Sequence, residues 1–424
     1  MQPRKSPFIV WLTLAAILAA LMLMPAMSTA STFKILHKFV GPDGTEPEGR
    51  MIFDSAGNLY GTASAGGQMG GVCESLGCGT VFKLSPNPDR SWTETVLRTF
   101  TGGADGWGPD ALIFDAAGNL YGTTFFGGLI EGECNIGCGI VFKLTPNGKG
   151  SWTESVLHRF DGNDGAYPTS LLFDKAGNLF GTSLYGGATG SGVVFKLAPS
   201  ADGSWTESVL HSFEISDGEY PNPGLVFDAM GNLYGTTSDG GAGELYGNIF
   251  KLSPNPDGTW TEAEIYAFCH SPGCSDGSNP HAGLVVDAAG NLYGTTLLGG
   301  RAPFPYGDGT VFKLTPSSGG GWDYNVLHVF GGKPSKHPYD GLVLDDSGNL
   351  FGTTFYGGAA NDGTVFRLTP DASGTSAFNV LHVFMGAPSE LPVGNLVLDG
   401  SGNLFGTTLL CKSACLGVIY EITP

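Results

Sequence analysis

One short motif, Gly-Asn-Leu followed by Tyr or Phe and then Gly-Thr, occurs seven times in the 424 residues and constrains the fold more than any other feature. The copies are spaced about 54 to 61 residues apart, and each lies inside a longer repeating unit. Such a period is typical of architectures in which every unit is one supersecondary element. The asparagines of the seven copies are Asn58, Asn119, Asn178, Asn232, Asn291, Asn349 and Asn403.

Each of the first six units contains four short segments with the composition of β-strands. In the second unit they are Leu112–Asp115, Asn119–Thr124, Ile140–Pro146 and Trp152–Phe160. These segments are rich in β-branched and aromatic residues and are bounded by Gly, Pro, Asp or Asn. No convincing helical period follows residue 30. Four strands in a unit of this length predict one blade of a β-propeller.

The two ends of the chain complement one another. The seventh unit ends at Pro424 after its third strand. Residues 32–39 match the fourth-strand pattern Val-Leu-His-x-Phe, and no first three strands precede them. An N-terminal strand that fills the last blade would leave no open edge between the first and last blades. We therefore predict an all-β fold, a seven-bladed β-propeller with four antiparallel strands per blade, whose last blade is closed by the N-terminal strand.

Residues 1–30 have the three parts of a secretory signal peptide. Arg4 and Lys5 precede an apolar run over residues 8–24, and Ser28-Thr29-Ala30 offers small residues for cleavage. An uncleaved membrane anchor is the alternative, because the run has an intermediate length. We expect cleavage after Ala30, a single propeller domain over residues 31–424 with no later membrane span, and a secreted or periplasmic location.

The consensus of the repeats is Leu-x-x-Asp-x-x-Gly-Asn-Leu-Tyr-Gly-Thr-Thr-x-x-Gly-Gly, followed by Gly-Thr-Val-Phe-Lys-Leu and Val-Leu-His-x-Phe. This pattern resembles the GloVer tandem-repeat family of exported bacterial proteins over residues 32–424. Its Asp-x-x-Gly-Asn-Leu-Tyr core is also similar, more loosely, to NHL-type propellers. The resemblance implies an extracytoplasmic propeller and carries no activity to particular residues.

The charge balance excludes two classes of partner. The chain has 39 acidic and 20 basic residues, a formal net charge of −19. Removal of the signal peptide takes away Arg4 and Lys5 and brings the charge to −21, since −19 − 2 = −21. A nucleic-acid-binding protein shows the opposite balance, and a polyanionic membrane surface would repel this chain. We expect a monomer with no bound cofactor.

Repeated polar residues have structural explanations. The Asp that ends each first strand, such as Asp115, suits an Asx-type turn better than a calcium ligand, because its copies lie far apart around a ring. Histidines recur in one fourth-strand position, where Arg98 and Tyr266 replace them, so we interpret them as packing groups rather than catalytic bases. Third-strand lysines such as Lys83 and fourth-strand glutamates such as Glu94 are predicted to form cross-strand ion pairs.

The eight cysteines form four close pairs in the sequence. Three or four residues separate the members of each pair, which does not match zinc knuckles, and an exported chain favours disulfides. We predict local pairing, with cross-loop pairing as the alternative, and no metal site. The predicted disulfides join Cys73 to Cys78, Cys134 to Cys138, Cys269 to Cys274, and Cys411 to Cys415.

One face of the predicted ring carries the second-to-third and fourth-to-first strand connections, and we call it the loop face. Length variation, cysteine pairs and unrepeated aromatic residues gather in these connections. Functional residues are often found in such variable loops on a rigid scaffold. Simple covering of strand ends is the structural alternative. The candidate ligand contacts are Trp107, Phe126, Tyr185, Tyr220, Tyr306, Tyr339 and Tyr356.

Two functions fit this pattern. The first is a non-catalytic binding or scaffold propeller with a glycan or protein ligand and no catalytic residues. The second is a propeller hydrolase or lyase, similar to a lactonase or glycosidase, that uses loop-face carboxylates; no catalytic motif supports it. A catalytic site would require unrepeated acids or histidines to converge at the channel mouth. The candidates are Glu131, Glu133, Asp239, Glu244, His270, His281, Asp308, His337 and Asp340.

Overall fold

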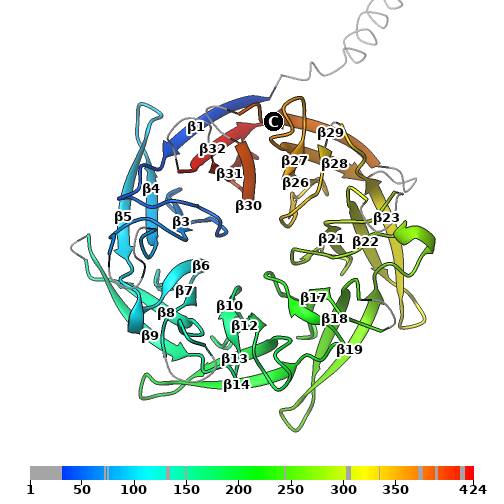
Figure 1. Ribbon diagram of the computed structural model, residues 1–424, viewed down its shortest axis with the longest axis horizontal. Coiled ribbons are helices and arrows are strands. Elements are labelled where there is room, and N and C mark those ends of the chain that lie inside the picture. The colour runs from blue at the N-terminus through cyan, green and yellow to red at the C-terminus, as the bar shows by residue number, and fades with distance from the viewer. Residues whose placement is uncertain are drawn as a thin grey trace, which may run out of the picture.

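The computed structural model contains a ring of seven four-stranded antiparallel sheets arranged around a central axis (Figure 1). The predicted signal peptide lies outside the residues that it describes. The described residues are 31–70, 73, 76–129, 134–148, 150–242, 245–301, 307–333, 335–370, 376–386, 390–410 and 416–424.

Blades 1 to 4 follow the chain. Blade 1 contains β2 (Ile52–Phe53), β3 (Leu59–Ala63), β4 (Thr80–Pro86) and β5 (Trp92–Thr99). Blade 2 contains β6 (Trp107–Phe114), β7 (Leu120–Phe126), β8 (Ile140–Pro146) and β9 (Trp152–Arg159). Blade 3 has a first strand in two pieces and contains β10 (Ala166–Pro168), β11 (Leu172–Phe173), β12 (Leu179–Tyr185), β13 (Val193–Pro199) and β14 (Trp205–Ser212). Blade 4 likewise contains β15 (Glu219–Pro221), β16 (Val226–Phe227), β17 (Leu233–Asp239), β18 (Asn248–Pro254) and β19 (Trp260–Ala267).

Blades 5 to 7 complete the ring. Blade 5 contains β20 (Val285–Val286), β21 (Leu292–Thr296), β22 (Thr310–Pro316) and β23 (Trp322–Val329). Blade 6 contains β24 (Ser335–Lys336), β25 (Val343–Leu344), β26 (Leu350–Thr354), β27 (Tyr356–Gly357), β28 (Thr364–Pro370) and β29 (Ser376–Val383). Blade 7 contains β30 (Glu390–Leu398), β31 (Leu404–Leu410), β32 (Val418–Thr423) and β1 (Thr32–Lys38). Two single 3-10 turns, η2 (Gly103–Asp105) and η3 (Pro272–Cys274), lie in fourth-to-first connections.

The N-terminal strand closes the ring, as predicted. β1 is antiparallel to β32 and is the outermost strand of blade 7, with Phe33 opposite Ile422 and Lys38 opposite Val418. In Figure 1 the blue N-terminal strand lies beside the red C-terminal strand. Closure pairs the outer edge of β32, which would otherwise be left exposed in the last blade.

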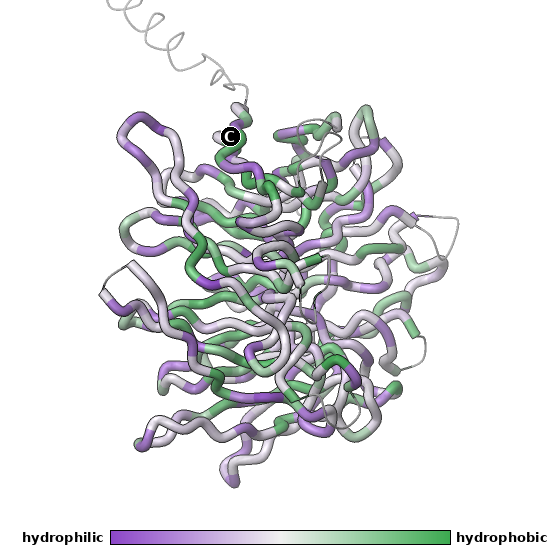
Figure 2. The backbone as a smooth tube through the Cα atoms, turned by 60° about the vertical axis from the view of Figure 1, so that its left-hand side comes forward, coloured by the Kyte–Doolittle hydropathy of each residue, from purple (hydrophilic) through white to green (hydrophobic). Residues whose placement is uncertain are grey.

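A repeated aromatic contact joins every blade to the next. The Phe just after each fourth strand packs against the third-strand aromatic ring of the following blade, with ring centroids 5.0–5.4 Å apart. Inside each blade the same third-strand ring lies over the Gly of the repeat motif. A Cβ on Gly61 would lie 2.5 Å from Cζ of Phe82, so the motif needs glycine there. The hydrophobic segments, green in Figure 2, accordingly lie mainly in the strands within the disc.

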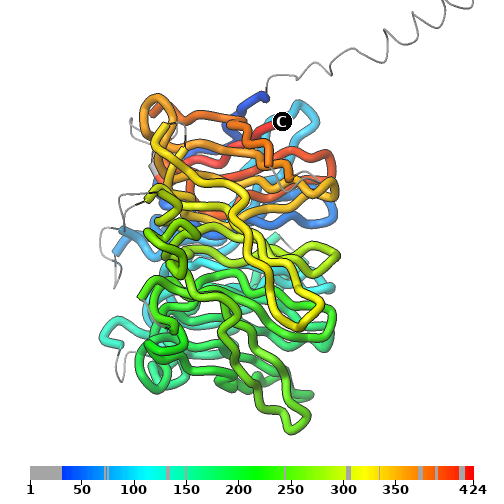
Figure 3. The backbone as a smooth tube through the Cα atoms, turned by 90° about the vertical axis from the view of Figure 1, so that its right-hand side faces the viewer, coloured from blue at the N-terminus to red at the C-terminus, as the bar shows by residue number. Residues whose placement is uncertain are grey.

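The repeated Asp is a turn residue, as the sequence indicated. Asp115 accepts hydrogen bonds through Oδ1 from the backbone N–H groups of Ala117 and Asn119, at 2.9 and 2.8 Å. Its Oδ2 accepts a bond from the side-chain amide of Asn119 at 2.6 Å. The other six blades repeat these three bonds. This fixes the face opposite the loop face, which we call the turn face; the two faces are seen edge-on in Figure 3.

The predicted cross-strand ion pairs are wrong. Lys83 lies opposite Thr95, whereas Glu94 lies opposite Leu84, so the two charges point to opposite faces of the sheet. Lys83 instead lies 5.6 Å from the ring centroid of Tyr60 on the second strand, and the lysines of blades 2 to 5 repeat this cation–π contact.

The fourth-strand glutamates face the preceding blade at the outer rim. Glu207 of blade 3 lies beside the His158–Asp164 pair of blade 2, whose His Nε2 and Asp Oδ2 are 2.8 Å apart. The pairs His37–Asp43 and His211–Asp217 repeat this geometry, and the latter lies with Glu262 in a group whose ligand atoms are within 4.8 Å of one another. Because the group recurs between blades, we interpret it as an inter-blade contact rather than a metal centre.

The remaining contacts at the outer rim also join neighbouring blades, but they use other side chains. Arg98 bonds Glu154 at 2.6 Å between blades 1 and 2. Stacked rings 3.9 to 4.0 Å apart join the last three pairs of blades. They are Tyr266 on Tyr324, His328 on Phe378 and His382 on Phe33. Two of the five fourth-strand histidines, His328 and His382, thus stack on a ring of the next blade. The other three each pair with an Asp at the outer rim.

The rim glutamates predict a pH dependence of stability. Burial raises the pKa of Glu207 from 4.5 to about 7, and the nearby Asp164 adds to the shift while His158 opposes it. The folded-state pKa is above the unfolded value, so this stabilisation is fully present below about pH 4.5 and is lost as the pH rises through 7. We expect Glu207→Gln to raise the melting temperature relative to wild type at pH 8 and to leave it nearly unchanged at pH 5.

Differential scanning calorimetry from pH 5 to 8 measures this difference. Glu214→Gln is the matched control, because it removes the same charge from an exposed loop residue. A melting-temperature difference between Glu207→Gln and wild type that stays constant with pH would contradict the assignment.

Candidate functional site

A repeated backbone clamp presents side chains on the loop face. In every blade the residue before the first-strand proline has a positive φ, between 51° and 67°. Its N–H donates a hydrogen bond to a second-to-third loop of the preceding blade, as Tyr167 does to the carbonyl of Cys138 at 2.8 Å. Non-glycine residues in this conformation cost about 1–3 kcal/mol each and persist only where the surroundings impose them. The clamp residues are Glu46, Gly108, Tyr167, Tyr220, Asn279, His337 and Leu391.

Predicted and neighbouring aromatic residues meet in one continuous row, which we call the aromatic arc. Its members come from blades 2 to 4: Trp107, Phe125, Phe126, Tyr167, Tyr185 and Tyr220. Trp107 stacks on Phe126 with centroids 4.2 Å apart, and Phe126 lies 5.3 Å from Tyr167. Tyr185 connects Tyr167 to Tyr220, at 5.6 and 5.0 Å.

The arc begins at a pocket of about 350 Å³, the aromatic pocket. Its lining includes Trp107, Phe125 and Phe126, together with Glu48 and Asp110. The tryptophan and both phenylalanines are partly exposed, so their faces are open to a ligand. Two sequence-predicted contacts, Trp107 and Phe126, therefore lie at a real cavity.

The other predicted aromatics form a second cluster over blades 5 and 6. Tyr339 lies 4.0 Å from the ring of His281 and 5.6 Å from Phe355. Phe355 in turn contacts Tyr356 at 4.8 Å. Tyr306 is outside the described residues.

The loop face is also the apolar face of the described structure. Every exposed large hydrophobic residue except Val209 and Met230 lies in a second-to-third or fourth-to-first connection or at its edge. The residues on the loop face are Val40, Met69, Leu76, Leu129, Ile136, Tyr185, Ile215, Leu245, Tyr339, Met385 and Leu416.

Three of the four predicted disulfides are present and stiffen this face. Cys73–Cys78 and Cys134–Cys138 lie in second-to-third loops, and Cys269–Cys274 lies in a fourth-to-first loop. The carbonyls of Cys78 and Cys138 accept the clamp bonds of Gly108 and Tyr167, so these two disulfides support the start of the aromatic arc.

The fourth predicted disulfide is the one between Cys411 and Cys415. Its two members, Cys411 and Cys415, both lie outside the described residues. The three disulfides of the described structure therefore do not include it. A bond between Cys411 and Cys415 stays a prediction from the sequence.

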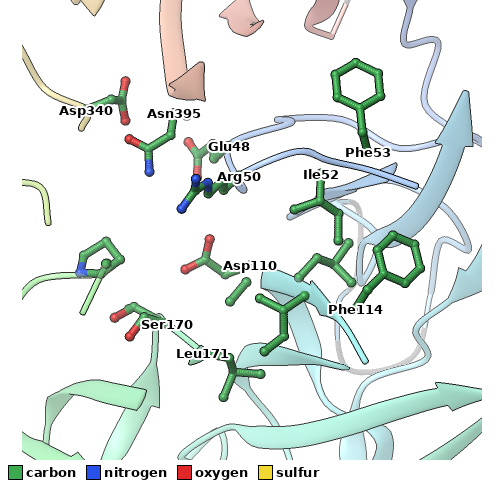
Figure 4. Close-up of a pocket in the computed structure, with 17 residues that line it drawn as sticks. Glu48, Arg50, Ile52, Phe53, Asp110, Phe114, Ser170, Leu171, Asp340 and Asn395 are labelled. Atoms are coloured by element: carbon green, nitrogen blue, oxygen red, sulfur yellow. The ribbon is translucent and has the colours of Figure 1, made fainter. Parts of the chain in front are cut away.

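A second pocket of about 420 Å³, the channel pocket, occupies the central axis (Figure 4). Its polar lining comes from residues that lie in the innermost strands of several blades or in the segments directly before them. Figure 4 shows these side chains around one shared space. They include Glu48, Arg50, Asp110, Ser170, Asp340 and Asn395.

The carboxyl groups of the channel pocket have strongly perturbed acidity. Burial raises the pKa of Asp110 to about 7, and the negative charge of Glu48 adds to the shift. Burial likewise raises the pKa of Asp340 to about 7, with Glu48 adding to it and hydrogen bonds from Gly394 and Thr353 opposing it. The pKa of Glu48 is also raised, first by burial and then by Glu46. Shifts of this size cluster at functional sites.

The two half-buried aspartates of the channel pocket, Asp110 and Asp340, differ in their partners. Asp340 accepts a bond from the Thr353 hydroxyl at 3.4 Å, and the neighbouring Asn395 Oδ1 accepts the N–H of Gly341 at 2.6 Å. The carboxylate of Asp110 makes no hydrogen bond or ion pair with any residue that the structure describes; its backbone carbonyl accepts the Thr62 hydroxyl at 2.8 Å. Asp110 is therefore held by its backbone and keeps its carboxyl group free.

The predicted acids and histidines do not converge. Asp340 lines the channel pocket, whereas Asp239 bonds Asn279 at 2.8 Å and His337 lies 3.9 Å from Asp308. His281 stacks on Tyr339, and the side chain of His270 contacts none of these groups within the described residues. Glu131, Glu133 and Glu244 are outside the described residues.

Sequence reasoning missed Glu48, Arg50, Asp110 and Asn395. A usable signal existed, because aligning the seven units on the Asp of the turn places these residues, with Asp340, four to six positions before it. Most other units have Gly, Ala, Ser or Pro four or five positions before that Asp. A charged residue at an aligned position where other units have small residues therefore indicates a side chain that lines the central axis.

The fold and these pockets define an all-β propeller with a charged axis and an aromatic loop face. The chain belongs to the Gloeobacter/Verrucomicrobia repeat family, whose model matches residues 23–226, 73–303 and 303–424. This confirms the resemblance seen in the sequence. No curated protein matches the chain. No helix of the described residues is long and apolar enough to cross a membrane.

Solved structures share the propeller fold at low identity. The extracellular domain of a hybrid two-component system from B. thetaiotaomicron is 13% identical, with a TM-score of 0.53, and the match covers 93% of this chain and 41% of that one. PorZ, a surface component of the type-IX secretion system of Porphyromonas gingivalis, is 16% identical, with a TM-score of 0.51 and coverage of 94% and 48%. A gluconolactonase from Xanthomonas campestris is 15% identical, with a TM-score of 0.40 and coverage of 72% and 82%. At these identities the likeness concerns the fold alone.

The positive φ of the clamp residues predicts a difference in stability between two variants that lack the same side chain. Tyr167→Gly and Tyr167→Ala both remove the ring, but only glycine adopts φ of 59° without steric cost. We expect the glycine variant to be more stable than the alanine variant by about 1 kcal/mol in urea unfolding.

The neighbouring Phe126 supplies the matched control, because it lies in the regular strand β7. There the order should reverse, with Phe126→Ala more stable than Phe126→Gly. The same order at both positions would show that residue 167 is not strained.

Proposed function

We propose that the protein is an exported, monomeric glycan-binding propeller that holds its ligand along the aromatic arc. The observation that carries this proposal is the continuity of the arc with the aromatic pocket, from Tyr220 in blade 4 to Trp107 in blade 2. Aromatic rings give a large apolar contact at low entropic cost, which suits the C–H faces of sugar rings.

The surroundings favour a glycan over a protein ligand. The arc leads toward the axis, where Ser170 and Asp110 line the channel pocket and offer hydrogen-bonding groups to hydroxyls. Clamp bonds and disulfides hold the arc in place, so little ordering entropy would be lost on binding. Three disulfides also fit an oxidising compartment, which supports export through the predicted signal peptide.

A glycan array tests the proposal. We expect wild type to bind a defined set of glycans, and Trp107→Ala, Tyr185→Ala and Tyr220→Ala each to weaken that binding about 3- to 10-fold. Titration calorimetry on the bound glycans gives the affinities. Met230→Ala is the control, because Met230 is 79% exposed on the turn face.

Two outcomes would contradict the arc as the binding surface. One is an unchanged affinity in all three arc variants. The other is a loss of binding in Tyr356→Ala, which alters only the second aromatic cluster.

Cleavage of the bound glycan is the second candidate function. Asp110 and Asp340, whose pKa values are about 7, suit general acid–base chemistry near neutral pH, and Glu48 lies close enough to perturb both. Incubation with the glycans found on the array, followed by mass spectrometry, should then give shortened products that Asp110→Asn does not make. If the glycans stay intact, cleavage is contradicted and the proposed binding function without catalysis remains.

A further inference from the structure

Aromatic residues lie at the backbone clamp of three consecutive blades. Tyr167 and Tyr220 are the clamp residues of blades 3 and 4, and Trp107 directly precedes Gly108, the clamp residue of blade 2. These blades follow one another along the lower side of the ring in Figure 1. The fold therefore presents an aromatic contact three times in succession along the loop face.

The ends of two second strands widen these contacts. Phe126, at the end of β7, lies opposite Trp107 in the strand ladder. Tyr185, at the end of β12, lies opposite Ala166, the neighbour of Tyr167. Successive rings of the arc are 4.2 to 5.6 Å apart between centroids, and all six arc side chains are at least partly exposed. The arc is therefore one accessible strip of adjoining rings rather than three separate contacts.

A strip of adjoining rings suits a ligand that is itself a repeat. A compact ligand in the aromatic pocket would leave the far rings of the arc uncovered, whereas a chain of like units can place successive units on successive blades. Sugars joined through equatorial bonds form extended chains whose C–H faces lie open along the chain, and such faces pack on aromatic rings. A branch would stand between a sugar face and a ring, so the arc favours unbranched chains.

Carboxyl groups flank the arc at both ends. Glu219 and Asp239 lie opposite each other in the strand ladder of blade 4, next to Tyr220. At the other end, Glu46 and Glu48 line the aromatic pocket, whose described lining contains no Lys or Arg. A carboxylate or sulfate on the ligand would be repelled at either end, since like charges interact over a Debye length of about 8 Å at physiological salt. The charge distribution therefore disfavours acidic chains.

We propose that the ligand is an extended, unbranched glycan without acidic groups, which lies lengthwise along the aromatic arc and contacts blades 2, 3 and 4 in turn. This inference rests on the proposed glycan-binding function and adds the class of glycan to it. The aromatic pocket, with Trp107, Phe125 and Phe126 in its lining, supplies the largest contact, and Tyr220 supplies the last one. Affinity then depends on how many rings the chain is long enough to cover.

Chain length provides the first test. Titration calorimetry at pH 7 measures the binding of β-1,4-linked oligomers of glucose, of mannose and of N-acetylglucosamine, from the dimer to the hexamer. We expect the affinity to rise about tenfold or more from dimer to hexamer in at least one series, because a longer chain covers more rings. If dimer and hexamer have the same affinity in every series that binds, the lengthwise arrangement is wrong and the glycan-binding function still stands.

Variants at the two ends of the arc separate a lengthwise chain from a local contact. Trp107→Ala, at the aromatic pocket, should weaken the hexamer and the shortest measurable oligomer alike. Tyr220→Ala, at the far end, should weaken the hexamer about threefold or more and leave the shortest oligomer nearly unchanged. Tyr356→Ala is the matched control, because it removes a tyrosine of the second aromatic cluster. Thermal melts verify that each variant is folded. An equal loss for both lengths in Tyr220→Ala would overturn the lengthwise arrangement.

An acidic chain tests the charge part of the proposal. The β-1,4-linked hexamer of mannuronic acid should bind at least about tenfold more weakly than the tightest neutral hexamer, and added salt should narrow the difference because it screens the repulsion. Mannuronate binding as tight as that of the neutral hexamer would overturn the exclusion of acidic chains. Glycan-array binding confined to branched or acidic glycans would overturn this inference alone, whereas an empty array would overturn the proposed function as well.

Discussion

The ring depends on one contact, the packing of each fourth-strand Phe against the third-strand aromatic ring of the next blade. Seven such contacts, at 5.0–5.4 Å between centroids, join the blades in a closed circle. Each third-strand ring also packs against the motif glycine on the second strand of the same blade. One side chain therefore takes part both in the packing within a blade and in the packing between neighbouring blades. Closure by β1 lets this cycle run without a gap between blades 6, 7 and 1.

A frame held in this way can impose unfavourable conformations elsewhere. The clamp residues keep a positive φ before proline in all seven blades, and two half-buried aspartates, Asp110 and Asp340, lie at the axis with pKa values of about 7. Both features cost stability, and both occur where ligands would meet the protein. The turn face shows the opposite behaviour, because its aspartates are fully hydrogen-bonded in the same way in every blade.

The loop face and the axis are the two places where the seven blades differ from one another. Seven equal blades would offer seven equal sites. Here the aromatic arc covers only blades 2 to 4, and the charged positions at the axis differ from blade to blade. Similarity to the two-component sensor domain and to PorZ concerns the fold alone, so the proposed function rests on these unrepeated residues.

The sequence by itself determined the fold, because each repeat unit carries the residues that form its own strands and turns. The fourth-strand segment that the last unit lacks is found at residues 32–39. The sequence also located Trp107, Phe126, Tyr185 and Tyr220 on the loop face, because antiparallel strands that follow one another place alternate connections on the same face. It misassigned the Lys83 and Glu94 pairing, because a one-residue difference in register moves a side chain to the opposite side of a sheet. Only the tertiary structure brought Glu48, Asp110 and Asp340 together. They are far apart along the chain, and their shared pocket and altered acidity arise from ring closure and burial, which no local pattern encodes.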